Sequence, residues 1–411
     1  MPWKETCAME ERMKFIFDYK KQGFSKAALC RIFGISRPTG DKWLDRYAQT
    51  GIAGLADQSR APKYHPNQVS PEIEEAILSA RRAYPHWGPK KLRTLLERKM
   101  PRQSWPAIST IGEILSRHGL TVPRKRRRRT PPYTQPFAAC DGPNAVWCGD
   151  FKGWFKTGDG SRCDPLTISD AASRYLLRCQ VVKSTGFETT RGLFEATFRQ
   201  YGLPLAIRTD NGSPFAGRGI GGLSRLSVWW IKLGIVPERI EPGKPQQNGR
   251  HERMHRTLKA ETAKPPARTL RAQQRAFDRF CEEFNHVRPH EALEMATPAS
   301  VYTYSPRPYP ERLGPVEYPS GLVVRMVKQH GDFHWRGHRV FLGEAFGRER
   351  IGLEPVDDRY WTVYFGERVL GVFDSHRYLV LPLRQAARAG VSIVEPSGGP
   401  SATLQGLQTV T

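Results

Sequence analysis

The sequence predicts a multidomain protein in which all-α helix-turn-helix modules come first, a central α/β core follows, and a small all-β, barrel-like domain comes last. The length of 411 residues suits two to four domains of roughly 100–200 residues each. Apolar residues recur at helical spacing up to about residue 120, and β-like and helical runs follow between residues 140 and 305. Residues 322–380 then alternate with period two, as in W-T-V-Y-F-G-E-R-V-L-G-V-F-D, which is typical of strands.

The charge of the chain indicates a polyanionic partner. Lys and Arg together number 64 against 40 Asp and Glu, which gives a formal net charge of +24. An excess of this size is typical of nucleic-acid-binding proteins, although basic ribosomal and membrane-surface proteins share it. A hydrophobic content of 39% with 10 Trp permits packed cores, so the chain is not simply a disordered basic tail.

Membrane, secreted and zinc-bound classes are disfavoured by the remaining composition. No apolar run approaches the roughly 18–20 residues of a membrane helix, and the start M-P-W-K-E-T-C-A-M-E-E-R-M-K lacks a signal-peptide core. The 7 Cys are odd in number and form no C-x-x-C pair, so we expect neither a disulfide framework nor a zinc cluster. A reducing cytoplasm is the expected setting.

Residues 1–60 are predicted to form a three-helix module. Met13, Ile16 and Phe17 share one face of the first helix, and serines precede the second and third helices as N-caps. A helix, a glycine turn and a second helix are the pattern of a helix-turn-helix DNA reader, although an ordinary three-helix bundle shares it. On the third helix, four side chains are expected to point outward and contact DNA: Arg37, Thr39, Lys42 and Arg46.

A second helical DNA-binding domain is predicted for residues 61–122, where three helical runs follow Ser70 and Gly119 ends the last. A basic, Pro-rich linker then covers residues 123–139. Adjacent cations repel one another and prolines keep the chain extended, so this linker is expected to be solvated. Its cations are also expected to lie along DNA phosphates: Arg124, Lys125, Arg126, Arg127, Arg128 and Arg129.

Three acidic residues of the central core have unusual surroundings. Asp150 lies inside the apolar run V-W-C-G-D-F, Asp210 closes the run A-I-R-T-D, and Glu252 begins a predicted helix after Q-Q-N-G-R-H. Carboxylates at two strand ends and on one helix can converge on a pair of Mg²⁺ or Mn²⁺ ions, which prefer oxygen ligands. An ordinary strand end explains T-D-N-G when it is taken alone. We interpret the nearby Asp164 and Asp170 as structural acids.

The helix that carries Glu252 also carries basic residues. His255, Arg256 and Lys259 follow Glu252 by three, four and seven residues and therefore share its stripe of the helix. We interpret them as a basic surface that holds DNA beside the acidic residues. An intrahelical pair between Glu252 and Arg256 is the alternative.

The order of the motifs around these residues resembles bacterial insertion-sequence transposases of the DDE superfamily, which are related to retroviral integrases. The motifs are W-C-G-D-F, T-D-N-G, Q-N-G-R-H-E-R-x-H-R-T-L-K and F-N-H-V-R-P-H-E-A-L-x-x-x-T-P. The resemblance covers the helix-turn-helix region and most of residues 140–302. It implies a ribonuclease H-like core in which Asp150, Asp210 and Glu252 are catalytic and bind two ions, Mg²⁺ or Mn²⁺. The His/Cys zinc module of retroviral integrases has no counterpart, so zinc is not expected.

The resemblance also implies a function. A transposase would bind the terminal inverted repeats of a mobile element and catalyse metal-dependent DNA cleavage and strand transfer. Its expected partners are double-stranded DNA, from the element ends and the target, and further copies of itself, since joining two DNA ends implies at least a dimer. We expect no membrane partner and a bacterial cytoplasmic, nucleoid-associated location. Two alternatives remain: a ribonuclease H-like nuclease without strand transfer, and a catalytically silent DNA-binding regulator.

The last part of the chain is predicted to contain two segments of different character. Residues 320–384 are expected to form the small β-barrel domain, which resembles modules of integrases. Residues 386–411 are rich in Ala, Ser, Gly and Thr, and we expect them to form a disordered tail.

Overall fold

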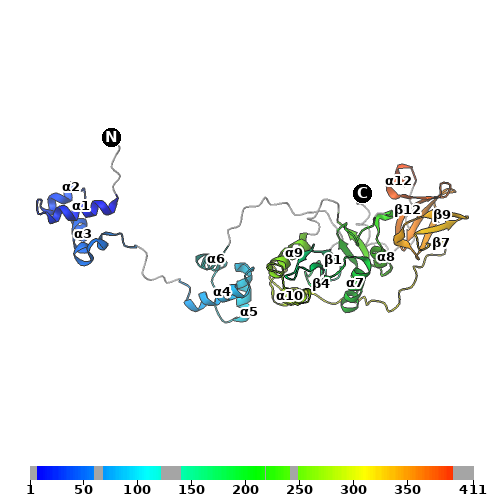
Figure 1. Ribbon diagram of the computed structural model, residues 1–411, viewed down its shortest axis with the longest axis horizontal. Coiled ribbons are helices and arrows are strands. Elements are labelled where there is room, and N and C mark those ends of the chain that lie inside the picture. The colour runs from blue at the N-terminus through cyan, green and yellow to red at the C-terminus, as the bar shows by residue number, and fades with distance from the viewer. Residues whose placement is uncertain (1–6, 60–67, 122–139, 218, 241–248, 392–411) are drawn as a thin grey trace. The chain divides into compact units, whose positions relative to one another are not determined.

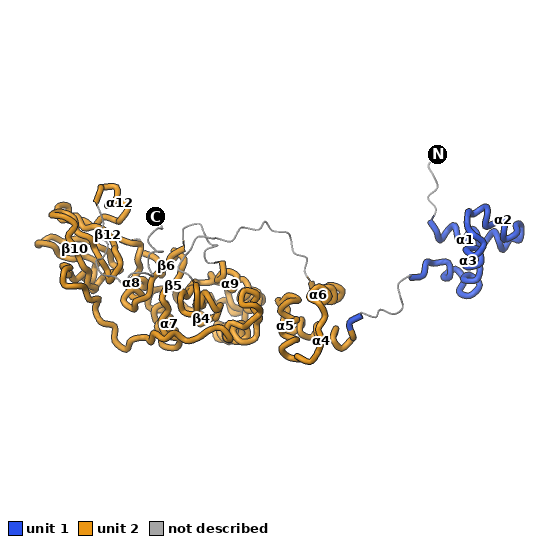
Figure 2. Tube along the Cα trace, turned by 180° about the vertical axis from the view of Figure 1, so that it is seen from behind, with its two compact units in different colours: residues 1–69 blue, residues 70–411 orange. Residues whose placement is uncertain are grey.

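The computed structural model describes residues 7–59, 68–121, 140–217, 219–240 and 249–391. The chain divides into two compact units, residues 1–69 and residues 70–411 (Figure 2). Along the chain, helices come first, a mixed group of strands and helices follows, and a group of strands comes last (Figure 1). This order confirms the predicted fold class. The predicted linker of residues 123–139, with its six cations, lies outside the described residues.

The described residues of the first unit form three α-helices and a short 3-10 helix: α1 Ala8–Lys20, α2 Lys26–Ile32, α3 Arg37–Thr50 and η1 Gly51–Leu55. The two serine N-caps are confirmed. The Ser25 hydroxyl accepts a hydrogen bond from the backbone N–H of Ala28, and the Ser36 hydroxyl accepts one from the backbone N–H of Thr39. These bonds satisfy donors that the first helical turn leaves free.

The core of the first unit differs in part from the predicted one. Its buried members are Phe15, Ile16, Leu29, Cys30, Trp43 and Leu55. The predicted face of α1 is correct for Ile16 but wrong for Met13 and Phe17, whose exposed fractions are 42% and 61%. Phe15 packs edge-on against Phe33 instead, so the buried stripe lies on the side of α1 that Phe15 and Ile16 share.

Three further helices begin the second unit: α4 Pro71–Ala83, α5 Pro89–Lys99 and α6 Ile108–Arg117. Pro71 and Pro89 occupy first helical positions, where a backbone N–H would have no helical partner anyway. Each helix turns a narrow apolar stripe inward, which makes a small shared core of Ile77, Leu78, Leu92, Leu95, Leu96, Ile111, Ile114 and Leu115.

A mixed sheet forms the centre of the second unit. Its strands are β1 Val146–Phe151, β2 Phe155–Lys156, β3 Arg162–Asp170, β4 Leu176–Val182, β5 Ala206–Thr209 and β6 Val236–Arg239. Strand β3 pairs antiparallel with β1, β2 and β4, whereas β1 pairs parallel with β5, and β5 pairs parallel with β6. This is the ribonuclease H-like arrangement that the sequence predicts for the core.

Helices cover both faces of this sheet. They are α7 Phe187–Tyr201, α8 Arg225–Lys232, α9 Gly249–Thr262 and α10 Leu270–Glu282. The described residues of this region also form four short helical segments: η2 Ile220–Gly222, η4 Glu283–Val287, η5 Glu291–Leu293 and α11 Pro298–Val301. Leu166 and Ile168 of β3 face α7 and α8, whereas Cys163 on the same strand faces α9 and α10. This follows from the alternation of side chains along a strand.

The last domain is antiparallel throughout. Its elements are β7 Val323–Met326, β8 Asp332–Trp335, β9 His338–Phe341, η6 Glu344–Phe346, β10 Arg350–Pro355, β11 Tyr360–Phe365, β12 Arg368–Asp374, β13 Leu379–Pro382 and α12 Leu383–Arg388. One sheet has the order β13-β12-β11-β10-β7, and β8 pairs with β9 as a hairpin. Leu223 and Val228 of the central region belong to the same hydrophobic cluster as this sheet.

The predicted disordered tail begins too early. Residues up to Arg388 form α12, and Ala386 is fully buried against Val372 and Val391. The low hydrophobicity of the segment hid this contact, because one small alanine is enough to dock a short helix. Residues 392–411 lie outside the described residues. None of the helices in the described ranges has the length and apolar content needed to cross a membrane.

Candidate active site

The sheet register brings two of the predicted acidic residues to the same level. Strands β1 and β5 are parallel neighbours, and Cys148 is opposite Arg208. Asp150 and Asp210 each follow that pair by two residues, at the carboxyl ends of their strands. Neighbouring strands lie about 4.8 Å apart, so both carboxylates lie at one edge of the sheet.

The turn behind Asp210 is held by two hydrogen bonds. The Asp210 carboxylate accepts one from the backbone N–H of Gly212 at 3.0 Å, and the Asn211 side-chain amide donates one to the carbonyl of Ile240 at 2.6 Å. A Cβ at Gly212 would come within 3.1 Å of the Asp210 carboxylate, so a glycine suits this position. The T-D-N-G motif is thus a turn, as the simpler interpretation says, and it also fixes the orientation of the carboxylate.

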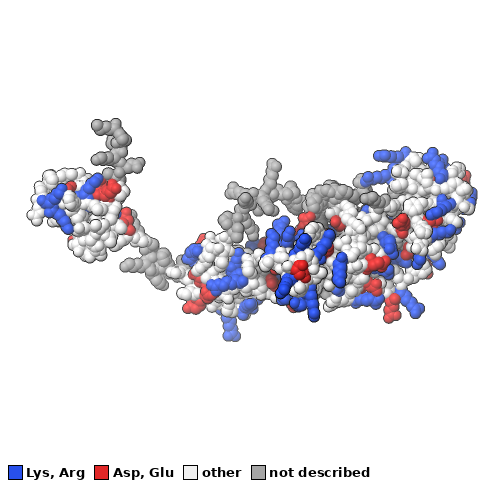
Figure 3. Space-filling model, viewed as in Figure 1, with Lys and Arg blue, Asp and Glu red and all other residues white. Residues whose placement is uncertain are grey.

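Glu252 lies in the first turn of α9 and lines an open hollow of about 520 Å³ that Asp150 also lines. Four cationic side chains line the same hollow: Lys152, Arg256, Lys259 and Lys264. Lys and Arg gather over the surface around α9 and α10 (Figure 3). An acidic centre surrounded by cations suits a negatively charged substrate that is held around a metal site.

The structure perturbs the ionisation of Asp150. Burial raises the pKa of Asp150 to about 7, and the negative charge of Asp210 adds to the rise, with a smaller contribution from Glu252. A carboxyl group that neighbouring carboxylates oppose in this way is stabilised by a cation. The charges of Asp210 and Glu252 therefore both act on Asp150, and carboxylate oxygens are donors that suit a hard divalent ion.

Two buried histidines of α9 contact Asp150 and the β3 side chains next to it. The Nε2 atoms of His251 and His255 lie 2.7 Å and 2.6 Å from the hydroxyl of Thr167, which is opposite Asp150 in the sheet. The Nδ1 atom of His255 lies 3.7 Å from the Asp150 carboxylate, and the Nδ1 atom of His251 contacts the Ser169 hydroxyl at 2.9 Å. Sequence reasoning missed this network.

The predicted role of His255 as a DNA contact is wrong. His255 is only 4% exposed, because it shares the buried face of α9 with His251, Met254 and Leu258. Burial lowers the pKa of His255 far below its usual range, with added repulsion from His251 and Lys152, so the imidazole is neutral. Only Arg256 and Lys259 of the predicted stripe are exposed cations.

The two histidines and Asp150 are also close enough to hold a metal ion together. A carboxylate oxygen of Asp150 and one ring nitrogen from each histidine lie within 4.8 Å of one another. The hydroxyls of Thr167 and Ser169 already contact both ring nitrogens of His251. The nitrogen of His255 that faces Asp150 is the one histidine nitrogen of this pair without such a hydroxyl contact in the described structure.

The structural interpretation of Asp164 and Asp170 agrees with their contacts. Asp170 is 1% exposed and accepts hydrogen bonds from the backbone N–H groups of Asn144 and Ser173 and from the Ser173 hydroxyl. Asp164 forms a two-pronged ion pair with Arg162. Both carboxylates are thus occupied by local partners.

The predicted DNA contacts of α3 differ in their freedom to bind. Arg37 and Lys42 are exposed. The Thr39 hydroxyl lies 2.8 Å from the Ser36 hydroxyl, and Arg46 donates a hydrogen bond to the Gln58 side chain, so both have local partners. The reading role of the four residues remains a prediction.

Comparison with known proteins identifies domains along most of the chain. Two models described as "Integrase core domain" match residues 141–245 and 233–298. A "Helix-turn-helix domain" matches residues 11–63, a "Homeodomain-like domain" matches residues 39–115, and an "IS481 family transposase, C-terminal domain" matches residues 322–378. An integrase core implies the use of a divalent metal, which suits the acidic and histidine cluster.

Relatives encoded by bacterial insertion elements cover the same regions. The chain is 26% identical over 283 residues to an uncharacterized protein of insertion element IS407 from Burkholderia multivorans, which covers 68% of this chain and 91% of the relative. It is 30% identical over 170 residues to a protein of insertion element IS136 from Agrobacterium fabrum, which covers 38% of this chain and 80% of the relative.

Among solved structures, the integrase catalytic core domain of HTLV-2 in complex with magnesium matches with 18% identity. The match covers 40% of this chain and 99% of that chain with a TM-score of 0.32, so the assignment rests on the domains and the insertion-element relatives. Helix-turn-helix modules that bind DNA, an integrase core of the polynucleotidyl transferase type and an IS481-type C-terminal domain occur here in one chain. The protein therefore belongs to the bacterial insertion-sequence transposases of the DDE superfamily.

Proposed function

We propose that Asp150, Asp210 and Glu252 form a metal-dependent catalytic centre that cleaves DNA at the ends of a mobile element and joins those ends to target DNA. The observation that carries the proposal is the parallel register of β1 and β5, which aligns the two aspartates, together with the raised pKa of Asp150. Asp150 and Asp210 would hold the ions at the sheet edge, and Glu252 would complete the set of ligands from α9. Mg²⁺ is the expected ion, and Mn²⁺ is expected to replace it.

Each group of the site has a distinct role in this proposal. When bound, two divalent ions supply the charge that activates an attacking oxygen and stabilises a leaving one. Lys152, Arg256 and Lys259 would hold DNA phosphates around the carboxylates. His255 would keep the Asp150 carboxylate in place through its position between Thr167 and Asp150. Water would be the attacking group in cleavage, and the exposed 3′ hydroxyl would be the attacking group in joining.

The other parts of the chain would select and assemble the DNA. We assign residues 1–60 and 61–122 to recognition of the terminal repeats, residues 123–139 to phosphate contact, residues 140–305 to catalysis and residues 320–384 to the small β domain. Joining two DNA ends requires at least a dimer, which sedimentation of the protein with and without DNA ends would reveal. With such a DNA partner, we expect the protein to associate with the bacterial nucleoid in the cytoplasm.

Replacing each ligand by its amide tests the proposal. Asp150→Asn, Asp210→Asn and Glu252→Gln keep side-chain size and remove one negative charge. Each variant should bind element ends as the wild type does but lose both cleavage and joining in Mg²⁺, measured with labelled duplexes that carry the repeats flanking the coding sequence. Each should also lose most of the rise in melting temperature that Mg²⁺ or Mn²⁺ gives the wild type.

Asp278→Asn is the matched control, because Asp278 is an exposed acid of α10 that bonds only to Gln274 in the described structure. It should behave as the wild type in every assay. Substantial joining by Asp210→Asn would refute the triad. Cleavage without joining by the wild type would instead support the nuclease alternative.

A further inference from the structure

An exposed tryptophan lies four residues after Asp150. The chain leaves β1 at Phe151, passes through Lys152 and Gly153, and reaches Trp154 just before β2. The exposed fraction of Trp154 is 57%, although an indole is among the side chains that gain most from burial. This residue plays no part in the catalytic centre proposed above.

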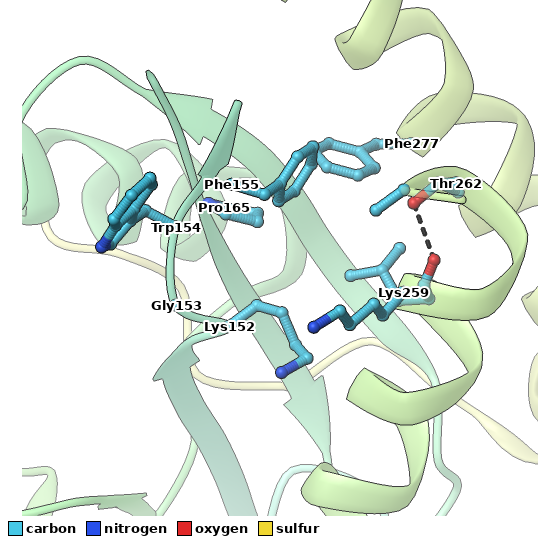
Figure 4. Close-up of a pocket in the computed structure, with 10 residues that line it drawn as sticks. Lys152, Gly153, Trp154, Phe155, Pro165, Lys259, Thr262 and Phe277 are labelled. Carbon is cyan, nitrogen blue, oxygen red and sulfur yellow. Dashed lines mark hydrogen bonds between the residues drawn. The ribbon is translucent and has the colours of Figure 1, made fainter. Parts of the chain in front are cut away.

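Local geometry keeps the indole outside the core. Gly153 has a φ of +80°, a left-handed conformation that turns the chain immediately before Trp154. Successive side chains of an extended chain point to opposite sides, and Phe155 is the one that points inward. Figure 4 shows Phe155 beside Phe277, whereas Trp154 lies apart from both. The position of Trp154 is therefore built into the strand connection.

A neighbouring cation restrains the ring. The guanidinium of Arg162 lies 5.2 Å from the centroid of the Trp154 ring, within cation–π range. Asp164 binds that guanidinium through two hydrogen bonds of 2.6 Å and 3.2 Å. An aromatic ring that is exposed but restrained loses little freedom when a second flat group stacks on it.

Two lysines connect Trp154 with the catalytic centre. Lys152 and Lys259 line a hollow together with Trp154, and both also line the larger hollow that contains Asp150. Figure 4 shows the Lys259 amine extending toward the Lys152 side chain, whereas the Lys152 amine turns away from it. Two ammonium groups that line one hollow favour an anion there, and none of the described residues that line the smaller hollow is acidic.

We propose that Trp154, Lys152 and Lys259 form a nucleotide-binding site, in which an unpaired base stacks on the indole and a phosphate of the same strand lies between the two amines. The proposal rests on the proposed function, since the strand is the one whose phosphodiester lies at Asp150. A base inside a duplex is already stacked on both faces, so the occupant is a base freed from pairing next to the reacting phosphate. Trp154 is then a positioning residue.

A fluorescent base tests the stacking directly. Duplexes with the flanking terminal repeats would carry 2-aminopurine at one of the last positions of the strand to be cut. They would be mixed with the full chain without divalent ions, so that the DNA is not consumed. Stacking lowers 2-aminopurine fluorescence, so wild type and Trp154→Phe should quench it at one or two positions, and Trp154→Ala should not. Equal fluorescence with wild type and Trp154→Ala at all positions would overturn the proposal.

Joining rates supply the second measurement. Trp154→Ala should join DNA about 5- to 150-fold more slowly, the range expected for loss of one base–aromatic stack, whereas Trp154→Phe should retain most of the rate. Lys152→Gln should weaken binding and reduce the log–log salt slope by about 0.9, the value for one phosphate. Tyr304→Ala is the control, because Tyr304 is also an exposed aromatic residue, with an exposed fraction of 66%. Its neighbour Thr303 is hydrogen-bonded to Asn144, which precedes the start of β1, whereas Asp150 lies near the end of that strand.

The outcomes separate the two proposals. If Asp210→Asn joins DNA as the wild type does, the catalytic proposal fails whatever Trp154 does. If Asp210→Asn is inactive while Trp154→Ala joins at the wild-type rate, the nucleotide site alone fails. If Trp154→Phe is as slow as Trp154→Ala, stacking is not the reason for the loss, which also overturns the inference.

Discussion

The first helical unit builds its hydrophobic core from its own residues, whereas the C-terminal β domain shares its core with the central region. The six buried core residues of the first unit all come from residues 15–55. The core of the β domain includes Leu223 and Val228 from the central region, and Lys232 of α8 forms an ion pair of 2.8 Å with Glu349. Sequence patterning marks both as separate modules, but only the first is also a separate compact unit. A change of pattern along a chain therefore marks a structural boundary without showing that the segment folds alone.

Deleting the C-terminal β domain or the first helical unit should give the largest difference in the stability of the remaining chain. A chain that ends at residue 315 would expose Leu223 and Val228, both 3% exposed in the full structure. At about 1.5–3 kcal/mol for each buried aliphatic side chain, its main unfolding transition should lose about 3–6 kcal/mol. A chain that starts at residue 68 should keep the main transition. Thermal unfolding of the full chain and of both truncated chains would measure this. Equal melting temperatures for the two truncated chains would contradict the expected difference between the two regions.

The second-largest effect should be on sequence-specific DNA binding by α3, with little change in stability. Arg37→Ala and Lys42→Ala remove exposed cations of α3. Arg37→Ala should not move the unfolding transition, whereas Lys42→Ala should cost at most about 1 kcal/mol, because the Lys42 amine lies 4.8 Å from the centroid of the Trp43 ring. Binding of the terminal repeat should weaken about 5- to 150-fold if either residue reads a base, with a smaller loss on random DNA. Fluorescence anisotropy at one fixed salt concentration measures both.

Arg31→Ala is the matched control for these substitutions, because Arg31 is an exposed cation of α2 in the same unit. Its effect on both DNAs should be small and equal. Equal losses on repeat and random DNA for Arg37→Ala would mean that α3 is held to DNA without reading it.

The smallest effect should come from single ion pairs in the two regions. Lys232 and Glu349 have side chains only 15% and 18% exposed, so Lys232→Met should leave Glu349 half-buried without this partner. We expect a loss of about 1–2 kcal/mol in the free energy of unfolding, as for a hydrogen bond to a charged group. Lys14→Met in the first unit breaks a pair with Glu11 whose side chains are 53% and 43% exposed, and no measurable loss is expected. Chemical denaturation of both variants would decide, and equal changes would mean that burial is not the relevant difference.

The sequence predicted features that depend on residues close together along the chain, and it missed contacts between residues far apart along the chain. The serine caps of α2 and α3 and the strand ends at Asp150 and Asp210 depend on neighbours within a few residues, and the structure has those elements where they were expected. The contact between Thr167 and the two α9 histidines joins residues 84 and 88 positions apart, and no local pattern contains it. Helical spacing showed that His255 and Glu252 are close on α9, but the position of the sheet decides that His255 is buried.

The strand connection at residues 146–156 has a consequence for protein engineering. It carries the Asp150 carboxylate, the Lys152 amine and the Trp154 indole within five residues, on a segment that turns at Gly153. Inserting or deleting one residue there would shift the segment by one position, so that Gly153 or Phe155 would stand where Trp154 now stands. A library designed to test the proposed DNA contacts of this segment should therefore vary residue types at 152–156 and keep the length of the segment fixed.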